Sequence, residues 1–465
     1  MLGLFGSLDM ASRSLSAQQE ASAVAGQNMA NVNNPGYARE RAVIQTAPPL
    51  DTPAGQEGTG ANLVSITEVR DNLLDQQIQS ENSATGSYAA QQTALQNAES
   101  YLGEQVTNTS TSAAGSTNGL AAKLDKLFNS FSSLTTSAGN PGSVVQSGQE
   151  VATQFNQDSS SLQQINSNLN TSIQNDVNAS NQDLTEIAAL NQQIMVAQGG
   201  GGTANDLVDE RQQKIEDLAG KLDITTSAQA NGSISISIGN VAMVTGGSNV
   251  DTLQTYDTGG GQLGVQDSVG AAPLAVTGGS IGGNMTVRDG ALADLQTGLD
   301  TLASQLITKV NTIYSAGYSS SGATGQNFFT GSNSGNIAVN SALVADPSQF
   351  QTSSTPGAGG DTGIALALAQ LGTQSNAALG NQSINGNYAQ IVSDLGTAIN
   401  TATDQLNTSQ TISTSLANQR SSESGVSIDT EMTNLMQFQK AYEASAQLIT
   451  TLNQMMETVI SMKTV

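Results

Sequence analysis

The feature that most constrains this 465-residue sequence is an amphipathic stripe at each of its ends. Toward the C-terminus, apolar side chains recur at alternating steps of three and four residues, and Ser445 fills the one gap in the series. This spacing places the side chains on one face of a helix that begins near Ile428. A single helix cannot bury such a stripe by itself, so the helix needs a partner. The stripe consists of Leu435, Phe438, Tyr442, Ile449, Leu452, Met456 and Val459.

The N-terminal segment offers a partner, because it carries the same periodicity. Helices with such seams can pair as coiled coils. We expect the two to pair in antiparallel orientation, since the chain leaves the first helix near Val32 and enters the last near Ile428 from the same middle region. Periodicity alone leaves an alternative of equal weight, in which each helix packs on its own neighbour in an ordinary bundle. The N-terminal stripe consists of Leu4, Leu8, Ala11, Leu15, Gln18, Ser22, Ala25, Met29 and Val32.

Between the ends, the longest helical pattern covers residues 144–197, where apolar residues lie mostly three and four apart. One unbroken helix of this length would span about 80 Å at about 1.5 Å per residue, a length typical of rods. The period changes to two at residues 233–238, where isoleucine alternates with serine, and Asn231-Gly232 before them is a strong hairpin turn. Further helical stripes lie at 68–102, 120–134, 292–313 and 387–420.

These patterns predict a mainly α fold with one β-rich module, arranged as an elongated rod of long helices. Because the module lies midway along the chain, we expect it at the far turn of the rod, away from both termini. The predicted divisions are an N-terminal helix (1–40), an extended linker (41–66), a first helical part of the rod (67–222), a β-rich outer module (223–280), a returning helical part (281–427) with a Gly/Ser-rich loop at 318–362, and a C-terminal helix (428–465).

The charge balance excludes several classes of partner. The chain has 14 Lys and Arg residues against 38 Asp and Glu residues, for a formal net charge of −24. A nucleic-acid groove needs a basic footprint, and anionic membrane surfaces attract basic segments, so both kinds of partner are disfavoured. The sequence has no apolar run of the length that spans a bilayer, and no basic segment precedes its first apolar residues, so we expect neither a membrane span nor a cleaved signal peptide.

The sequence contains no cysteine, histidine or tryptophan. Disulfides, Cys-His and Ser-His catalysis are therefore excluded, and a zinc site would need carboxylates alone. The glycine run at 199–202 ends a helical pattern and lacks the lysine of a phosphate-binding loop, so we interpret it as a plain connection. No carboxylate pair lies beside an aromatic platform for sugars, which disfavours a wall-cutting hydrolase. We expect no enzyme, and no catalytic, cofactor-binding or metal-binding residues.

The run Asn-Met-Ala-Asn-Val-Asn-Asn-Pro-Gly-Tyr-Ala-Arg at 28–39 resembles the N-terminal signature of flagellar axial proteins. Its Pro-Gly-Tyr-x-Arg ending resembles the hook-associated protein 1 family, the hook–filament junction proteins. Segments 69–77, 205–211, 287–318 and 325–329 resemble the same family, and 431–446 resembles the C-terminal signature shared with rod proteins. The motif residues are Asn31, Asn33, Pro35, Gly36, Tyr37 and Arg39.

The resemblance implies a structural component of the bacterial flagellum that joins hook to filament and is required for filament assembly. It implies a location at the extracellular hook–filament junction and export through the flagellar type III apparatus. The implied partners are further copies of the chain, the hook protein, the second hook-associated junction protein and a cytoplasmic export chaperone. The implied assembly interface comprises the apolar stripe residues Leu4, Leu8, Leu15, Met29, Leu435, Phe438, Tyr442, Ile449, Leu452, Met456 and Val459.

Two alternatives accompany this interpretation. Within the axial proteins, a hook or distal rod protein is the second choice, although Pro35 and the long helical midsection disfavour both. In another class, a cytoplasmic signalling coiled coil of chemoreceptor type shares the long Ala/Ser/Gln-rich helices. Such a protein needs membrane spans and has no β-rich module, so we rank it below the flagellar assignment.

Overall fold

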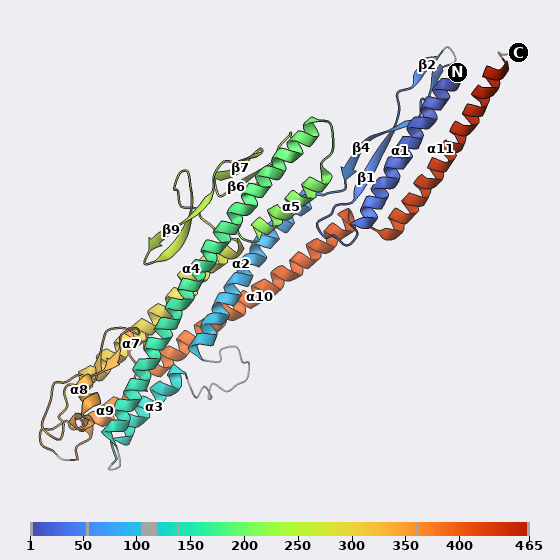
Figure 1. Ribbon diagram of the computed structural model, residues 1–465. Helices are drawn as coiled ribbons and strands as arrows, with labels where there is room; N and C mark the ends of the chain where they lie inside the picture. Colours follow the sequence, from blue (N-terminus) through green and yellow to red (C-terminus); the bar gives the residue numbers. More distant parts are fainter. Residues whose placement is uncertain (1–2, 53–54, 104–118, 137–139, 359, 463–465) are drawn as a thin grey trace.

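A single helix of 59 residues, α4 (Pro141–Gly199), forms the spine of the molecule (Figure 1). It starts where Asn140 caps the first turn by accepting a hydrogen bond from the Gly142 N–H at 2.9 Å, and Pro141 occupies the first helical position. The unbroken helix predicted at 144–197 is thereby confirmed. The computed structural model describes residues 3–52, 55–103, 119–136, 140–358 and 360–462.

The chain travels the length of the rod four times (Figure 1). Helix α2 (Asn72–Leu102) leads away from the termini to α3 (Leu120–Ser133) at the far end, and α4 returns. After α5 (Asn205–Ala219) and the strands, α6 (Gly279–Val287), a π-turn and α7 (Ala293–Tyr314) lead away again. Helix α10 (Ile384–Ser424) brings the chain back toward the termini. Mainly helical architecture in an elongated rod is thus confirmed.

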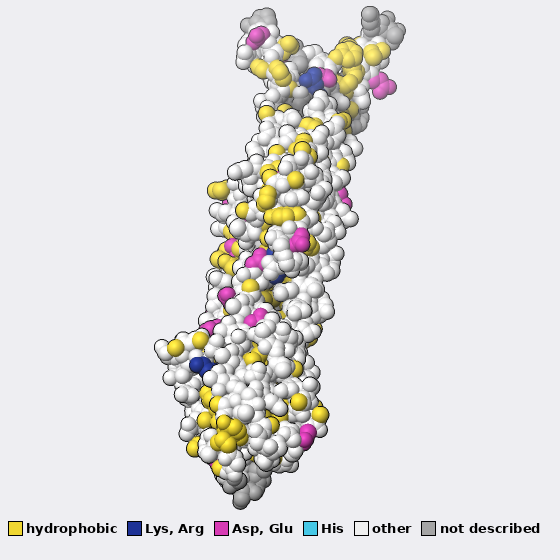
Figure 2. Space-filling model, turned by 90° about the vertical axis from the view of Figure 1, so that its left-hand side faces the viewer, with side chains coloured by type: hydrophobic (Ala, Val, Ile, Leu, Met, Phe, Trp, Pro, Cys, Tyr) yellow, Lys and Arg dark blue, Asp and Glu magenta, His cyan; other side chains and the backbone are white. Residues whose placement is uncertain are grey.

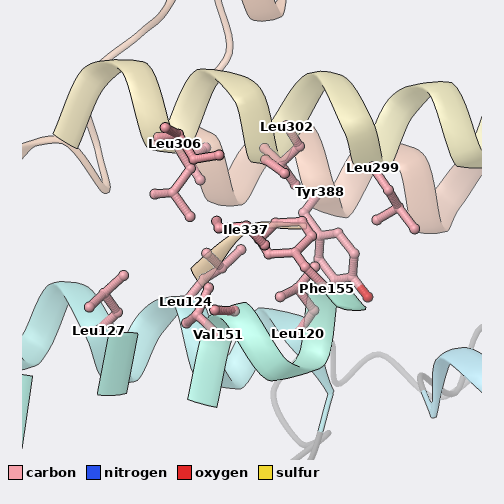
Figure 3. Packing of buried hydrophobic residues seen from close by; sticks show 14 of the residues in the cluster. Leu120, Leu124, Leu127, Val151, Phe155, Leu299, Leu302, Leu306, Ile337 and Tyr388 are labelled. Atoms are coloured by element: carbon pink, nitrogen blue, oxygen red, sulfur yellow. The ribbon is translucent and has the colours of Figure 1, made fainter. Parts of the chain in front are cut away.

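The far end of the rod holds the main apolar core, which joins α3, α4, α7 and α10 (Figure 3). Leu124, Phe155 and Leu302 are fully buried there. The segment 318–362, which we expected to be a Gly/Ser-rich loop, lies at this end of the rod and contributes buried residues to its core. Its elements are β11 (Phe329–Thr330), β12 (Ala338–Val339), α8 (Ser341–Ala345) and a 3₁₀ turn (Pro347–Gln349), and α9 (Gly363–Gln370) follows directly.

The β-rich module flanks the upper half of α4, on the side nearer the termini (Figure 1). The expectation that it lies at the far turn is therefore wrong, because α4 is long enough to bring the chain back before the first strand begins. Ile236, Ile238 and Met243 are fully buried in a second core with α4 and α5. Strands β5 (Thr225–Ala228), β6 (Ile234–Ile238), β7 (Val241–Thr245) and β8 (Ser248–Asn249) form one sheet, and β9 (Leu253–Gly259) pairs with β10 (Gln262–Asp267).

Residues 41–66, expected as an extended linker, instead form strands. Their hydrophobic residues pair across the ladder, as Ile44 does opposite Leu63, and the prolines at 48 and 49 lie between strands rather than within them. Gly55, the first residue of β3, has a φ of +116°, a backbone conformation that other residues resist. Strand β1 (Glu40–Thr46) pairs with β4 (Ala61–Glu68), and β2 (Leu50–Thr52) pairs with β3 (Gly55–Glu57).

The two terminal helices, α1 (Leu4–Ala30) and α11 (Ile428–Met462), pack together and are called the terminal pair below. Both chain ends lie at the same end of the molecule (Figure 1). Ala21 and Ala25 of α1 line the same pocket as Asn434 and Phe438 of α11, so late α1 meets early α11. The predicted antiparallel pairing is confirmed, and the alternative of separate bundles is wrong.

Candidate functional site

Three of the sequence segments singled out above, 28–39, 69–77 and 205–211, meet at the base of the terminal pair. There the end of α1, the strands β1 and β4, and the first turns of α2 and α5 converge. Because these elements belong partly to the terminal pair and partly to the rod, their contacts fix one against the other. This cluster, called the polar junction, comprises Asn28, Tyr37, Glu40, Glu68, Arg70, Asp75, Asn205 and Asp209.

Asn28 is the centre of the first half of the polar junction and is only 1 % exposed. Its Oδ1 accepts hydrogen bonds from the Tyr37 hydroxyl at 2.8 Å and from the Glu40 N–H at 2.9 Å. Its Nδ2 donates to the Glu40 carbonyl at 2.9 Å. Burial, reinforced by Glu40, raises the pKa of Tyr37, so the phenol stays protonated and can donate. The motif tyrosine therefore fastens strand β1 to the end of α1.

Arg70 is the centre of the second half. Its guanidinium binds Glu68 at 3.1 Å, Asp75 at 3.1 Å, and Asp209, which lies on α5. The Ala38 N–H donates to the Asp209 carboxylate at 3.0 Å, and Asn205 donates to the Glu40 carboxylate at 2.8 Å. One arginine thus ties the end of β4 to the first turns of two rod helices.

The polar junction carries more carboxylates than cations, and this imbalance alters their protonation. Burial, reinforced by Asp209, raises the pKa of Glu68 to about 7, although Arg70 opposes the shift. Burial raises the pKa of Asp209 to about 6 against the hydrogen bond from Ala38. One oxygen of Glu68 has no hydrogen-bond partner among the described residues. These raised pKa values predict that the strength of the connection between the terminal pair and the rod depends on pH near neutrality.

The remaining motif residues do not enter the polar junction. Asn31 donates to the Gln27 carbonyl at 3.1 Å, while Asn33 and Pro35 are exposed in the turn that follows α1. Gly36 lies in this turn as well. The Arg39 N–H donates to the Ser424 carbonyl at 2.8 Å, which links β1 to the end of α10. Asn28 begins the run 28–39 but is not among the six motif residues named from the sequence. It lies three turns after Ala17 on the buried side of α1, and this helical spacing could have indicated its burial.

The stripe residues of the expected assembly interface are covered only in part. On α11, Leu452 is 7 % exposed, whereas Tyr442 and Val459 are 38 % and 56 % exposed. The other α11 stripe residues, and the four α1 residues of that interface, are half-buried: Leu435, Phe438, Ile449 and Met456, with Leu4, Leu8, Leu15 and Met29. The stripe thus faces α1 without being fully enclosed by it.

The most buried residues of α1 are small ones that sequence reasoning largely missed. Helix α1 packs against α11 on one side and against β1 and β4 on another. Small side chains let the strands approach closely, and their i, i+4, i+7, i+8 spacing could have been read as a second face. These residues are Ala11, Ala17, Ala21, Val24 and Ala25, of which Ala11 and Ala25 belong to the predicted stripe.

Outside the seam, α11 exposes a second set of large apolar side chains. In the view of Figure 2, hydrophobic side chains gather on the two arms at the end of the molecule that holds the termini. Apolar patches of this kind on a soluble chain mark surfaces that another molecule covers. The residues of this second set are Ile428, Met432, Met436, Leu448, Met455, Ile460 and Met462, and the stripe residues Tyr442 and Val459 are exposed as well.

Within the described residues, no helix is both long and apolar enough to cross a membrane. Over the same residues, no group of three or more carboxylates is arranged to hold a metal ion. The polar junction and the terminal pair thus remain the candidate sites, and both mediate contacts between elements.

Comparisons with known proteins find that this chain is similar to flagellar proteins. The family model described as the flagellar hook-associated protein FlgK helical domain matches residues 105–329, and the model of the flagellar basal body rod FlgEFG protein C-terminal region matches 417–462. The flagellar hook-associated protein 1 of Bacillus subtilis is 28 % identical, with 99 % of each chain covered. Over nearly its whole length, the chain is thus similar to flagellar hook-associated protein 1.

Further hook-associated proteins match over almost their whole length. The Escherichia coli hook-associated protein 1 is 23 % identical, with 97 % of this chain and 98 % of that protein covered. The solved structure of the flagellar hook junction protein FlgK from Burkholderia pseudomallei aligns with a TM-score of 0.59 at 16 % identity. It covers 74 % of this chain and 98 % of that one, and supports the fold.

Proposed function

We propose that this chain is a structural component of the bacterial flagellum that joins the hook to the filament. The observation that carries the proposal is the terminal pair, which presents an apolar surface that the chain itself leaves uncovered, in a chain similar to hook-associated protein 1. A chain that must be covered by neighbours along one end, while its rod folds by itself, has the properties of an assembly subunit.

In this proposal the terminal pair is the part that enters the assembly. The stripe residues Phe438, Ile449 and Met456 pack against α1, and the outer residues of α11 pack against neighbouring subunits. The rod and its β-rich module carry polar faces and lie outside the assembled core. The polar junction transmits the orientation of the assembled terminal pair to the rod.

The partners proposed for this chain are further copies of itself, the hook protein, the second hook-associated junction protein and a cytoplasmic chaperone that protects the exposed face of α11 before export. We propose export through the flagellar type III apparatus to the extracellular junction. The absence of cysteine from the sequence fits passage through a narrow channel as an unfolded chain, because no disulfide can form on the way. The proposed role requires no catalysis.

Electron microscopy of a strain that lacks this gene tests the proposal. We expect intact hooks without filaments, with flagellin shed into the medium, and restoration of filaments by the wild-type gene. Loss of the hook itself would indicate a hook or distal rod protein instead. Normal filaments in the deletion strain would remove the proposal.

A further inference from the structure

Two arginines at the base of the terminal pair have no ion pair within the described residues. Arg39 and Arg41 flank Glu40 at the start of β1. Because side chains alternate across a strand, both arginines lie on one face and Glu40 on the other. The Glu40 carboxylate accepts its hydrogen bond from Asn205 of the rod. The arginine face is therefore distinct from the polar junction.

That face borders a pocket of about 370 Å³ between α1, β1 and α11, which we call the arginine pocket. It is lined by both arginines, by Glu40 and Glu431, and by apolar residues of the two helices such as Val24 and Phe438. Glu431 is 4 % exposed, and its carboxylate has no ion pair or hydrogen bond within the described part of the chain. Glu40 accepts from Asn205 instead of pairing with an arginine, so both guanidiniums remain without an ion pair among the described residues.

The cations of α1 and α11 among the described residues are paired within the chain. On the same two helices, Arg13 pairs with Asp9, and Lys440 pairs with Glu443 at 2.9 Å. With 38 acidic and 14 basic residues in the sequence, a carboxylate partner is easy to provide within one chain. Arg39 and Arg41 have no such partner among the described residues, so they are available to a carboxylate from outside the chain.

The terminal pair also offers exposed carboxylates without partners. Glu20 on α1, and Asp429 and Glu457 on α11, are exposed, and within the described residues their carboxylates form no ion pair or hydrogen bond. Each copy of the chain therefore carries both an unfilled arginine pocket and free carboxylates at the same end. Two complementary patches at different places on one subunit generate head-to-tail contacts, which extend into rings or helical arrays.

We propose that the arginine pocket binds a carboxylate of the terminal pair of a second copy of this chain, an inference that rests on the proposed assembly. The guanidiniums of Arg39 and Arg41 can hold a carboxylate with two parallel hydrogen bonds, a geometry that lysine cannot reproduce. The contact fixes the register of the apolar packing along α11, because the ion pair can form at only one axial displacement between neighbouring subunits.

A charge reversal in the arginine pocket tests this contact, and a charge reversal on the surface of the rod serves as its control. Lys309 on α7 is the control, since it is exposed and has no ion pair among the described residues. In the deletion strain, Arg41→Glu is expected to give at least about tenfold fewer filaments than Lys309→Glu, a change that corresponds to the loss of one strong contact. Equal filament numbers in the two strains would overturn the proposal.

Folding and partner identity are checked separately. The purified Arg41→Glu protein is expected to unfold at the temperature of the wild type, and Arg41→Gln, which lacks the repulsion, is expected to show a smaller loss of filaments. In the Arg41→Glu background, one of Glu20→Arg, Asp429→Arg or Glu457→Arg is expected to restore filaments.

Failure of all three reversals would overturn a second copy as the occupant and would assign the arginine pocket to a different axial protein. The deletion strain distinguishes this failure from failure of the proposed function. If the deletion strain grew normal filaments, that result would contradict both the proposed function and the proposed contact. If it lacked filaments while Arg41→Glu assembled like Lys309→Glu, only the contact would be removed.

Discussion

The rod and the terminal pair are built from the same kind of helix, yet they bury their apolar stripes to very different extents. In α4, 23 of 59 residues are buried, whereas in α11 only Glu431 and Leu452 of 35 residues are. Both helices show three-four periodicity in the sequence. The stripe therefore indicates that something must cover it, but not whether the cover comes from the same chain.

This difference predicts two levels of stability in one molecule. The rod encloses fully buried residues from four helices and has the contacts of an independently folding domain. The terminal pair has few buried contacts, and regions of that kind open locally at low cost in free energy. Substitutions should therefore affect the isolated protein strongly in the rod, less at the polar junction and hardly at all on α11.

The largest effect is expected in the rod core. Phe155 is fully buried among α3, α7 and α10, so Phe155→Ala should lower the free energy of unfolding by about 3–5 kcal/mol. Thermal unfolding followed by circular dichroism measures the change. Phe5→Ala is the control, because Phe5 is 78 % exposed and its loss should leave the transition in place. Similar effects of Phe155→Ala and Phe5→Ala on thermal unfolding would contradict the predicted difference in stability between the rod and the terminal pair.

A smaller effect is expected at the polar junction. Arg70→Met leaves Glu68, Asp75 and Asp209 together without their cation, which should cost about 2–3 kcal/mol, toward the lower end for broken ion pairs because Arg70 is partly exposed. Arg13→Met removes an exposed pair and should cost less than about 0.5 kcal/mol. Limited proteolysis should cut between the terminal pair and the rod faster in Arg70→Met. Unchanged cleavage would show that the junction does not hold the two regions together.

A pH dependence of the same junction gives a smaller effect. The folded-state pKa of Glu68 is raised to about 7 by burial and by Asp209, so its stabilising contribution is complete below about pH 4.5 and is lost as pH rises through 7. Glu68→Gln should therefore match the wild type at pH 5 and exceed its stability by about 1 kcal/mol at pH 8. Thermal unfolding at both pH values measures this. If Glu68→Gln were less stable than the wild type at pH 8, the ionised Glu68 side chain would stabilise the folded protein, which would contradict this prediction.

The smallest effect on the isolated protein is expected in α11. Ile449→Asp places a charge on a half-buried stripe, and thermal unfolding of the rod should change by less than about 0.5 kcal/mol. In flagella the same charge would be buried between subunits, where an unpaired carboxylate costs several kcal/mol. Motility of the complemented deletion strain should be lost. Wild-type motility would show that Ile449 is not in an assembled interface.

Much of the rod could be predicted from the sequence, because helical periodicity and capping residues are local signals. Asn140-Pro141 marks the start of α4, and the alternating isoleucines at 234–238 mark a strand. The position of the β-rich module could not be predicted, because it depends on how far α4 carries the chain and on the contacts of Ile236 and Met243 with α4 and α5.

Other features were hidden because they depend on close approach of backbones. Helix α6 arises from a glycine-rich segment that the sequence marks only as a turn. A Cβ on Gly283 would lie 2.2 Å from the Ser87 carbonyl oxygen of α2, so the glycine permits the two helices to touch. The strands at 41–66 were hidden for a different reason, since prolines and glycines at their turns dominate the composition.

The candidate site was predicted in pieces rather than as a whole. The segments that contain Tyr37, Arg70 and Asp209 each stood out as motifs, but no sequence signal joins residues 139 positions apart, as Arg70 and Asp209 are. Their meeting depends on the packing of the first turns of α2 and α5 beside β4. The stripe of α11 was correctly paired with α1, while its exposed outer residues are visible only in the folded chain.

Hydrogen–deuterium exchange of the purified, unassembled protein tests the central contrast most directly. The backbone amides of α4 between Val151 and Leu190 should be protected to nearly the global free energy of unfolding, whereas those of α11 from Met432 to Ile460 should exchange orders of magnitude faster. In isolated flagella the α11 amides should become protected. Protection of α11 equal to that of α4 in the free protein would contradict the account.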